Sequence, residues 1–164
     1  MIYYPLLFLL GTLVADAATV NGTAESCPSP FASVGGRCVH LDFSVSGSWY
    51  DMRQFCLQLG SDLAVLSDGQ FFVDSQQYIR TIGTPSENVH FWIGATDEEM
   101  EGLWLWIDGM PLVMGTPYWA NYGCDNKQMP DGGTAQNCAL LDASLHYFMN
   151  DVQCDHVHHP FCVL

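Results

Sequence analysis

The chain has 164 residues, and 18 Asp and Glu against four Lys and Arg give it a formal net charge of −14. The electrostatic field of so negative a chain repels nucleic acid phosphates and anionic membrane surfaces, so neither is an expected partner. The length suits one domain with a hydrophobic core of its own. Carboxylates are preferred ligands of Ca²⁺, which makes cation binding one interpretation of the charge. The other interpretation is that an acidic surface simply keeps an extracellular protein soluble.

The N-terminal residues resemble a secretory signal. The apolar run from Leu6 to Val14 is too short to span a bilayer, and Ala15-Asp16-Ala17 offers the small-residue pattern of a cleavage site. Asn21-Gly22-Thr23 is a glycosylation sequon. We therefore predict an extracellular product with a signal peptide at 1–17, a spacer at 18–26 and a domain at 27–164.

Turns and helices are predicted in the first half. Gly35-Gly36 indicates a hairpin within 27–41. Ser48 caps a first helix, with Asp51 in its first turn, and Gly60 ends it. A second helix starts at a Ser67–Gln70 capping box and ends at Gly83. The predicted inner stripe of the second helix is Phe72, Ser75, Ile79 and Ile82.

Strands and loops are predicted in the second half. Residues 89–94 indicate a buried strand, and the alternation of 104–108 indicates a strand with aromatic side chains on one face. Residues 138–141 and 161–164 are expected to be closing strands. From 110 to 134 the sequence has many turn residues and no regular period, and so long a loop in a compact domain is usually functional.

The cysteines indicate a disulfide framework. A secreted chain pairs its cysteines by default, and no Cys-x-x-Cys pair supports a zinc ribbon. Seven is an odd number, so one thiol stays free or finds a partner outside the domain. The seven are Cys27, Cys38, Cys56, Cys124, Cys138, Cys154 and Cys162.

Several motifs together resemble the C-type lectin domain family. Trp92-Ile93-Gly94-Ala95 is similar to the family's core strand, and 101–109 follows at family spacing with Glu-Gly-x-Trp-x-Trp-x-Asp-Gly. Tyr118-Trp119 then enters the long loop, Asn150-Asp151 precedes a cysteine, and Phe161-Cys162 closes the domain. The resemblance implies an α+β fold with two helices, antiparallel sheets and a long irregular loop.

The resemblance also implies the disulfide pairing and a core role for aromatics. It pairs Cys27 with Cys38, Cys56 with Cys162, and Cys138 with Cys154, which leaves Cys124 unpaired. Trp92 and Trp104 are expected in the core rather than in a sugar platform, and Trp119 stays open.

A calcium–sugar site is the functional feature that the resemblance implies. In sugar-binding members, oxygens from a Glu/Gln-Pro-Asn/Asp tripeptide, an acidic residue before the next cysteine and an Asn-Asp pair hold Ca²⁺. Two neighbouring sugar hydroxyls complete its shell. Here the tripeptide is Met129-Pro130-Asp131, with a cis bond implied before the proline, and the later ligands are Gln136, Asn150 and Asp151.

Met129 departs from that pattern, because a thioether is a poor ligand for a hard cation. Gln128 substitutes only if the loop shifts, and Gln136 brings an oxygen without charge. We therefore expect weak Ca²⁺ affinity, with Kd about 10⁻⁴–10⁻³ M. The other interpretation of Asn150-Asp151 is turn chemistry before Cys154.

Two further groups of residues are candidate cation sites. Additional Ca²⁺ among Asp97, Glu98, Glu99, Glu101 and Asp125 is one hypothesis, with a solvated loop at 97–101 preferred. The cluster 155–159 contains His156, His158 and His159, for which Zn²⁺ binding or pH sensitivity competes with an exposed turn, the preferred interpretation. His146 receives no role.

The favoured function is a secreted, Ca²⁺-dependent lectin with a degenerate site, which recognises microbial or cell-surface glycans in innate immunity. The alternative is a Ca²⁺-independent protein-binding module, in which Cys124 links two copies. Catalysis is not expected, since no nucleophile-elbow, zinc-protease or phosphate-loop motif occurs.

Overall fold

The computed structural model describes residues 26–164 except residues 87, 116 and 125–126. The predicted signal peptide, the sequon at Asn21 and Asp125 lie outside the described residues. In chain order the elements are β1 (Ala32–Val34), β2 (Arg37–Leu41), α1 (Trp49–Gln58), β3 (Asp62–Leu63), α2 (Gly69–Ile82), β4 (Phe91–Thr96), β5 (Leu105–Trp106), β6 (Asn121–Tyr122), β7 (Lys127–Gln128), η1 (Gly133–Ala135), β8 (Cys138–Asp142), η2 (Ala143–Leu145), β9 (Phe148–Val152) and β10 (His159–Val163).

Side-chain caps set where the two helices begin. The Ser48 hydroxyl accepts the Asp51 N–H, and the Asp51 carboxylate accepts the Ser48 N–H, so the first helix begins as predicted. The second prediction is wrong by one residue. Asp68, not Ser67, is the cap, because its carboxylate accepts the N–H groups of Gln70 and Phe71 at 2.8 and 3.1 Å.

The buried stripe of α2 also differs from the prediction at its end. Phe72, Ser75 and Ile79 are buried as expected, but Ile82 is 42% exposed. Phe71 and Gln76 are buried as well, because the apolar face of a helix that packs on a core is wider than one residue per turn.

A sheet that joins the two ends of the domain is the centre of the fold. Its strand order is β1-β2-β10-β4-β8-β9, with β3 paired to β10 and β5 to β4. All pairs are antiparallel except β4–β10, which is parallel. Gly94 is required in β4, because a Cβ there would lie 2.8 Å from the Leu63 carbonyl oxygen.

Two predictions about strands need correction. The aromatic segment 104–108 forms only the two-residue β5, because a turn closes directly after it, with the Gly109 N–H donating to the Trp106 carbonyl at 2.8 Å. Strand β9 was not predicted at all. Its Asn150-Asp151 pair lies within the strand, so the turn interpretation of this pair is wrong.

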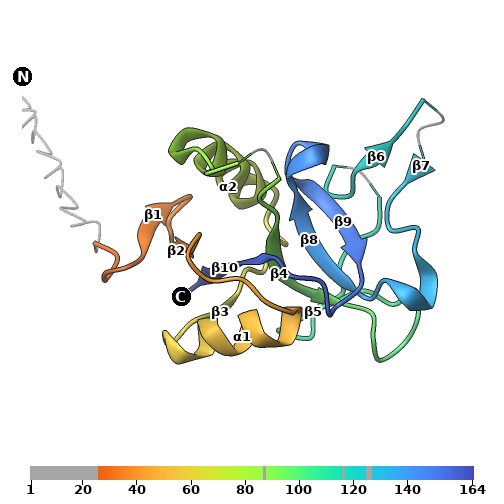
Figure 1. Ribbon diagram of the computed structural model, residues 1–164, viewed down its shortest axis with the longest axis horizontal. Coiled ribbons are helices and arrows are strands. Elements are labelled where there is room, and N and C mark those ends of the chain that lie inside the picture. Colours follow the sequence, from red (N-terminus) through yellow and green to blue (C-terminus); the bar gives the residue numbers. More distant parts are fainter. Residues whose placement is uncertain (1–25, 87, 116, 125–126) are drawn as a thin grey trace, which may run out of the picture.

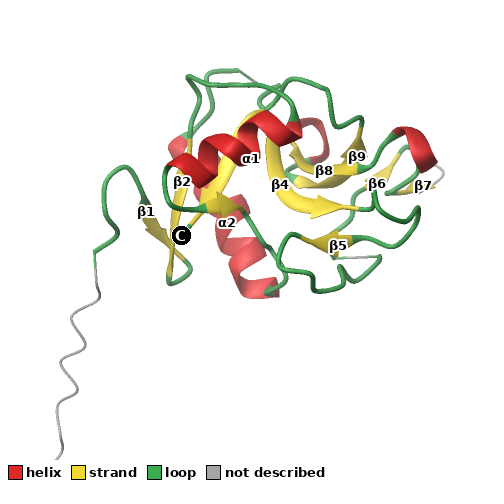
Figure 2. Cartoon of the chain, turned by 90° about the horizontal axis from the view of Figure 1, so that it is seen from below, coloured by secondary structure: helices red, strands yellow, loops and turns green. Residues whose placement is uncertain are grey.

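Two apolar clusters fill the space on either side of the sheet. Figure 1 shows α2 and α1 on opposite sides of β2, β10 and β4, and Figure 2 shows the β6–β7 hairpin at the far end from β1. Phe71, Phe72 and Ile79 of α2 belong to one cluster, and Trp49 and Met52 of α1 to the other. Trp92 and Trp104 are buried as expected, and Trp119 is only 1% exposed.

Three disulfides brace this fold with the pairing that the resemblance implied. Cys27–Cys38 closes the first hairpin, Cys56–Cys162 joins α1 to β10, and Cys138–Cys154 joins β8 to the segment after β9. Cys124 is an exposed free thiol.

The long-range disulfide is expected to stabilise the domain most. Removing Cys56 and Cys162 together opens a loop of 106 residues and should cost about 5 kcal/mol, against about 3 kcal/mol for Cys27 with Cys38, whose separation is 11. Urea unfolding of the two double-alanine variants measures both costs. Equal losses would contradict a chain-entropy origin.

Candidate functional site

The cis-proline loop between β7 and β8 turns its first residue inward. The Met129–Pro130 peptide bond is cis, as the resemblance implied. The Met129 side chain is buried with Trp104 and Trp119 in one apolar cluster, and its N–H donates to the Ala120 carbonyl at 2.9 Å. Met129 therefore serves the core and offers no ligand atom at the surface.

Asp151 ties this loop to strand β9. Its carboxylate is 1% exposed and accepts the Asp131 N–H at 3.0 Å on each oxygen and the Gly132 N–H at 2.7 Å. Burial raises the pKa of Asp151, although these backbone amides oppose the rise. The carboxylate is thus held by amide dipoles alone, with no cationic side chain bonded to it among the described residues.

Asn150, its neighbour, has one end of its amide fixed and the other unpaired. The side-chain nitrogen donates to Asp142 at 3.0 Å, while the side-chain oxygen is buried with no hydrogen-bond partner. Leaving such an acceptor unpaired costs about 1–3 kcal/mol. Asp142 therefore fixes which way the Asn150 oxygen points.

Asp142 is itself held by three neighbours. It accepts the Ser144 N–H at 2.8 Å and the Ser144 hydroxyl at 2.6 Å, and His90 Nδ1 lies 3.1 Å away. Burial raises the pKa of Asp142, but the hydrogen bonds from His90, Ser144 and Asn150 outweigh it and hold the pKa well below its usual range. The group is an ionised anchor at neutral pH.

Lys127, Gln136 and Gln128 complete the loop surface. The Lys127 ammonium lies 2.6 Å from the Asp131 carboxylate. Gln136 lies across Gly132, where a Cβ would come within 2.4 Å of the Gln136 Cβ, so only glycine fits at 132. Gln128 stands in β7 with its amide beside Gly115 and makes no hydrogen bond to the motif residues, as far as the described chain shows.

An acidic cavity of about 190 Å³ lies beside the loop, lined by Asp97, Glu101, Gln136 and Asp151 among others. Asp97 is 4% exposed, so the predicted solvated loop is wrong at its first residue. One Asp97 oxygen accepts the Gly102 N–H at 2.8 Å and the other has no partner. Burial raises the pKa of both Asp97 and Glu101, and the charges of Asp97 and Asp151 add to the rise at Glu101.

The histidine segment is only partly the exposed turn that was predicted. His156 is exposed, but His158 packs edge-on against Trp92 with ring centroids 4.9 Å apart. Burial, with the nearby His90, lowers the pKa of His158 to about 4, so this ring is neutral at neutral pH. Across the described residues, no three His, Cys, Asp or Glu side chains are grouped to hold a metal ion.

Sequence reasoning missed three residues that shape this region: Lys127, Gly132 and Asp142. Lys127 has one recognisable feature, because it is the only lysine in a chain of charge −14 and stands four residues before Asp131. Asp142 depends on His90 from a distant segment, and Gly132 depends on how the loop brings Gln136 against it, so no local pattern indicates either.

Comparison with known proteins identifies the family. The model of the lectin C-type domain matches residues 45–164. The chain belongs to the C-type lectin domain family. This family consists of carbohydrate-binding and related binding modules that commonly bind Ca²⁺ and are generally not enzymes, in line with the resemblance drawn from the motifs.

Individual relatives agree with this assignment. The chain is similar to asialoglycoprotein receptor 2 of Mus musculus, with 31% identity over 87% of this chain and 43% of that protein. It therefore spans less than half of that relative. The carbohydrate-recognition domain of the mouse scavenger receptor C-type lectin has a TM-score of 0.64 and 26% identity, covering 85% of this chain and 98% of that domain.

A third likeness concerns the fold alone. A calcium-independent type II antifreeze protein has a TM-score of 0.64 at 22% identity, covering 84% of this chain and 93% of that one.

Among the described residues, no helix has the length and apolarity needed to cross a membrane.

The anchor at Asp142 gives a pH-dependent prediction. Because its pKa is depressed in the folded state, its contribution is present above the unfolded value of about 3.9 and is lost as pH falls through the folded pKa. Asp142→Asn should cost about 1.5–3 kcal/mol at pH 7 and progressively less below pH 4. Urea unfolding from pH 7 to pH 2 measures the difference, and a penalty independent of pH would show that the charge is irrelevant.

Proposed function

We propose that the chain is a secreted lectin that binds glycans at the loop surface formed by 128–136 and β9, with a weakly held Ca²⁺. Asp131, Gln136, Asn150 and Asp151 would hold the cation. The observation that carries the proposal is a pair of oxygen donors at consecutive positions of β9. Among the described residues, the Asn150 oxygen is buried without a hydrogen-bond partner, and the Asp151 carboxylate is buried with no cationic side chain bonded to it.

The donor set fits a hard cation. Carboxylate and amide oxygens are the ligands of Ca²⁺, and a cation relieves both an orphaned amide oxygen and a desolvated carboxylate. Pairing between Lys127 and Asp131 opposes it only weakly, because the Lys127 side chain is 63% exposed and such surface pairs are worth about 0–1 kcal/mol. The expected affinity for Ca²⁺ is low because the Met129 side chain has no oxygen to serve as a ligand.

In this proposal the chain's own residues orient the ligand groups. Asp142 holds the Asn150 amide, and Asp151 holds the backbone that presents Asp131. When bound, Ca²⁺ supplies open coordination positions for two neighbouring sugar hydroxyls. A second cation in the acidic cavity would neutralise Asp97 and Glu101, where burial and the charges of Asp97 and Asp151 raise the pKa of Glu101.

The extracellular setting is part of the proposal. Three disulfides in one domain suit an oxidising compartment. The net charge of −14 disfavours nucleic acid and anionic membranes as ligands. Cell-surface or microbial glycans, met in innate immunity, stay the predicted targets.

Calcium binding is testable through stability. With Kd about 10⁻⁴–10⁻³ M, about 10 mM Ca²⁺ should stabilise the domain by about 1.4–2.7 kcal/mol. Asp131→Ala should abolish the gain while leaving the loop folded, because the Asp131 backbone N–H still donates to Asp151. Thermal unfolding with Ca²⁺ and with EDTA measures this, and glycan-array binding is read in parallel. No stability gain with Ca²⁺ in the wild type, or an equal gain in Asp131→Ala, would overturn the calcium mechanism.

Lys127 should compete with the cation. Lys127→Ala removes the ammonium that pairs with Asp131, so the affinity for Ca²⁺ should rise, by about fivefold at most because the pair is exposed. Arg53→Ala is the matched control, since it removes the same charge from a site where it pairs with Asp62. Isothermal titration with Ca²⁺ compares the three proteins. Equal affinities would place the cation away from Asp131.

A second candidate function is Ca²⁺-independent binding of a protein. Burial of Met129 in the core and the ammonium on Asp131 favour it, because both reduce the motif's metal-binding character. Exposed Cys124 would then join two copies. Electrophoresis without reductant tests the link: wild type should run as a dimer and Cys124→Ser as a monomer. A monomeric wild type would remove this idea.

A further inference from the structure

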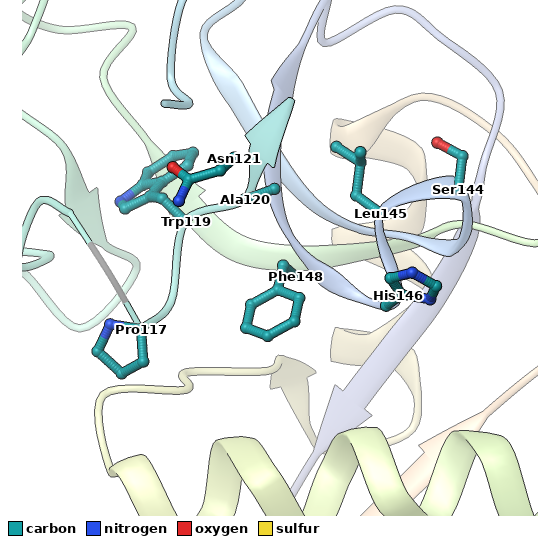
Figure 3. Close-up of a pocket in the computed structure, with 8 residues that line it drawn as sticks. All are labelled: Pro117, Trp119, Ala120, Asn121, Ser144, Leu145, His146 and Phe148. Atoms are coloured by element: carbon teal, nitrogen blue, oxygen red, sulfur yellow. The ribbon is translucent and has the colours of Figure 1, made fainter. Parts of the chain in front are cut away.

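A pocket of about 400 Å³ lies on the other flank of the same loop system and contains none of the predicted ligands of Ca²⁺. Figure 3 shows it between two segments, 117–121 and 144–148, with the Phe148 ring between Pro117 and His146 in that view. Its volume falls in the range of small-ligand sites, about 300–1,000 Å³.

The walls combine apolar rings with uncharged polar groups. Phe148, Leu145 and Pro117 supply apolar surface, while Asn121, Ser144 and His146 supply an amide, a hydroxyl and an imidazole. Among the described residues no carboxylate lines this pocket, in contrast to the cavity at Asp97 and Glu101. The groups available to a ligand here are therefore apolar groups and uncharged hydrogen-bonding side chains.

The turn that presents His146 is held in an unfavourable conformation. His146 and Tyr147 have φ of 59° and 62°, the left-handed region that few residues other than Gly adopt, with Asn, Asp and His more common there than the rest. The bulky Tyr147 is the more strained of the two, and such a conformation persists only where its surroundings fix it.

Helix α2 supplies that fixation. Arg80 donates to the His146 carbonyl and Gln76 to the Tyr147 carbonyl, each at 2.8 Å. The Tyr147 N–H also donates to the Asp142 carbonyl at 2.7 Å. Two side chains from a distant helix thus hold a strained turn at the edge of the pocket, and strain of this kind clusters at ligand sites.

The opposite wall is fastened to the same strand. The Ala120 N–H donates to the Met149 carbonyl, and the Met149 N–H to the Tyr118 carbonyl, both at 2.9 Å. Both walls therefore meet at β9, one or two residues before Asn150. Since Met129 bonds to Ala120, the pocket adjoins the loop of the proposed glycan site. A rigid pocket next to that loop suits a further unit of the same ligand.

We propose that this pocket is a metal-independent subsite for a neutral pyranose residue. A pyranose presents an apolar C–H face, which suits the ring of Phe148, and a rim of hydroxyls, which suit Asn121, Ser144 and His146. A neutral sugar is favoured over an acidic one because the chain's charge of −14 repels anions. The choice of a sugar rests on the proposed function, whereas the absence of a metal requirement rests on the pocket itself.

The subsite is tested by nuclear magnetic resonance in EDTA. ¹⁵N-labelled protein is titrated with methyl glycosides of mannose, galactose and glucose up to about 50 mM. At least one glycoside should shift the amide signals of Ala120 and His146 and the indole N–H of Trp119. His146→Asn, which suits the left-handed turn while removing the imidazole, and Asn121→Ala should each weaken binding at least fivefold. Arg53→Ala, which removes a charge that pairs with Asp62 and does not line this pocket, is the control and should bind as wild type.

Three results would overturn the subsite: no shift with any glycoside, shifts confined to 129–136, or wild-type affinity in both pocket variants. Shifts with benzyl alcohol but with no sugar would do the same, because they would mark the pocket as purely apolar. Failure of the calcium proposal is separate, since it is measured with Ca²⁺ and Asp131→Ala, and sugar binding in EDTA would persist.

Discussion

The buried carboxylate of Asp151 is the constraint on which the binding face depends. It accepts the backbone N–H groups of Asp131 and Gly132, and so joins the cis-proline loop to strand β9. Amide dipoles alone meet its charge, which leaves the carboxylate partly desolvated and its pKa raised. These backbone hydrogen bonds connect the loop to β9 at the carboxylate that is also a proposed ligand of Ca²⁺.

Strand β9 contains Asp151 and also contributes residues to the rest of the binding face. Asn150, one residue before Asp151, donates its side-chain N–H to Asp142, and Phe148 lines the neighbouring pocket. The backbone of Met149 holds the segment that enters the long loop. The proposed calcium-assisted contact and the proposed metal-free subsite thus share one rigid strand, so a glycan with two or more units can engage both without rearrangement of the domain.

The sequence predicted the scaffold well and the site poorly, for physical reasons. Motifs such as Trp92-Ile93-Gly94-Ala95 indicate the fold because close packing demands them, as the approach of the Leu63 carbonyl to Gly94 shows. Strand β9 escaped prediction because Asn150-Asp151 looks like a turn, and only pairing with β8 makes it extended. Asp97 was named as a candidate cation ligand, but its burial was not predicted, because it depends on the loop folding back to donate the Gly102 N–H.

Amide hydrogen exchange in EDTA tests the role of Asp151 most directly. If its carboxylate holds the loop without a metal ion, the N–H groups of Asp131 and Gly132 should be protected in the metal-free protein. Asp151→Ala should remove that protection while the amides of β4 and β10 keep theirs. Exchange of both loop amides at unprotected rates in the wild type, with protection gained only on adding Ca²⁺, would contradict the account.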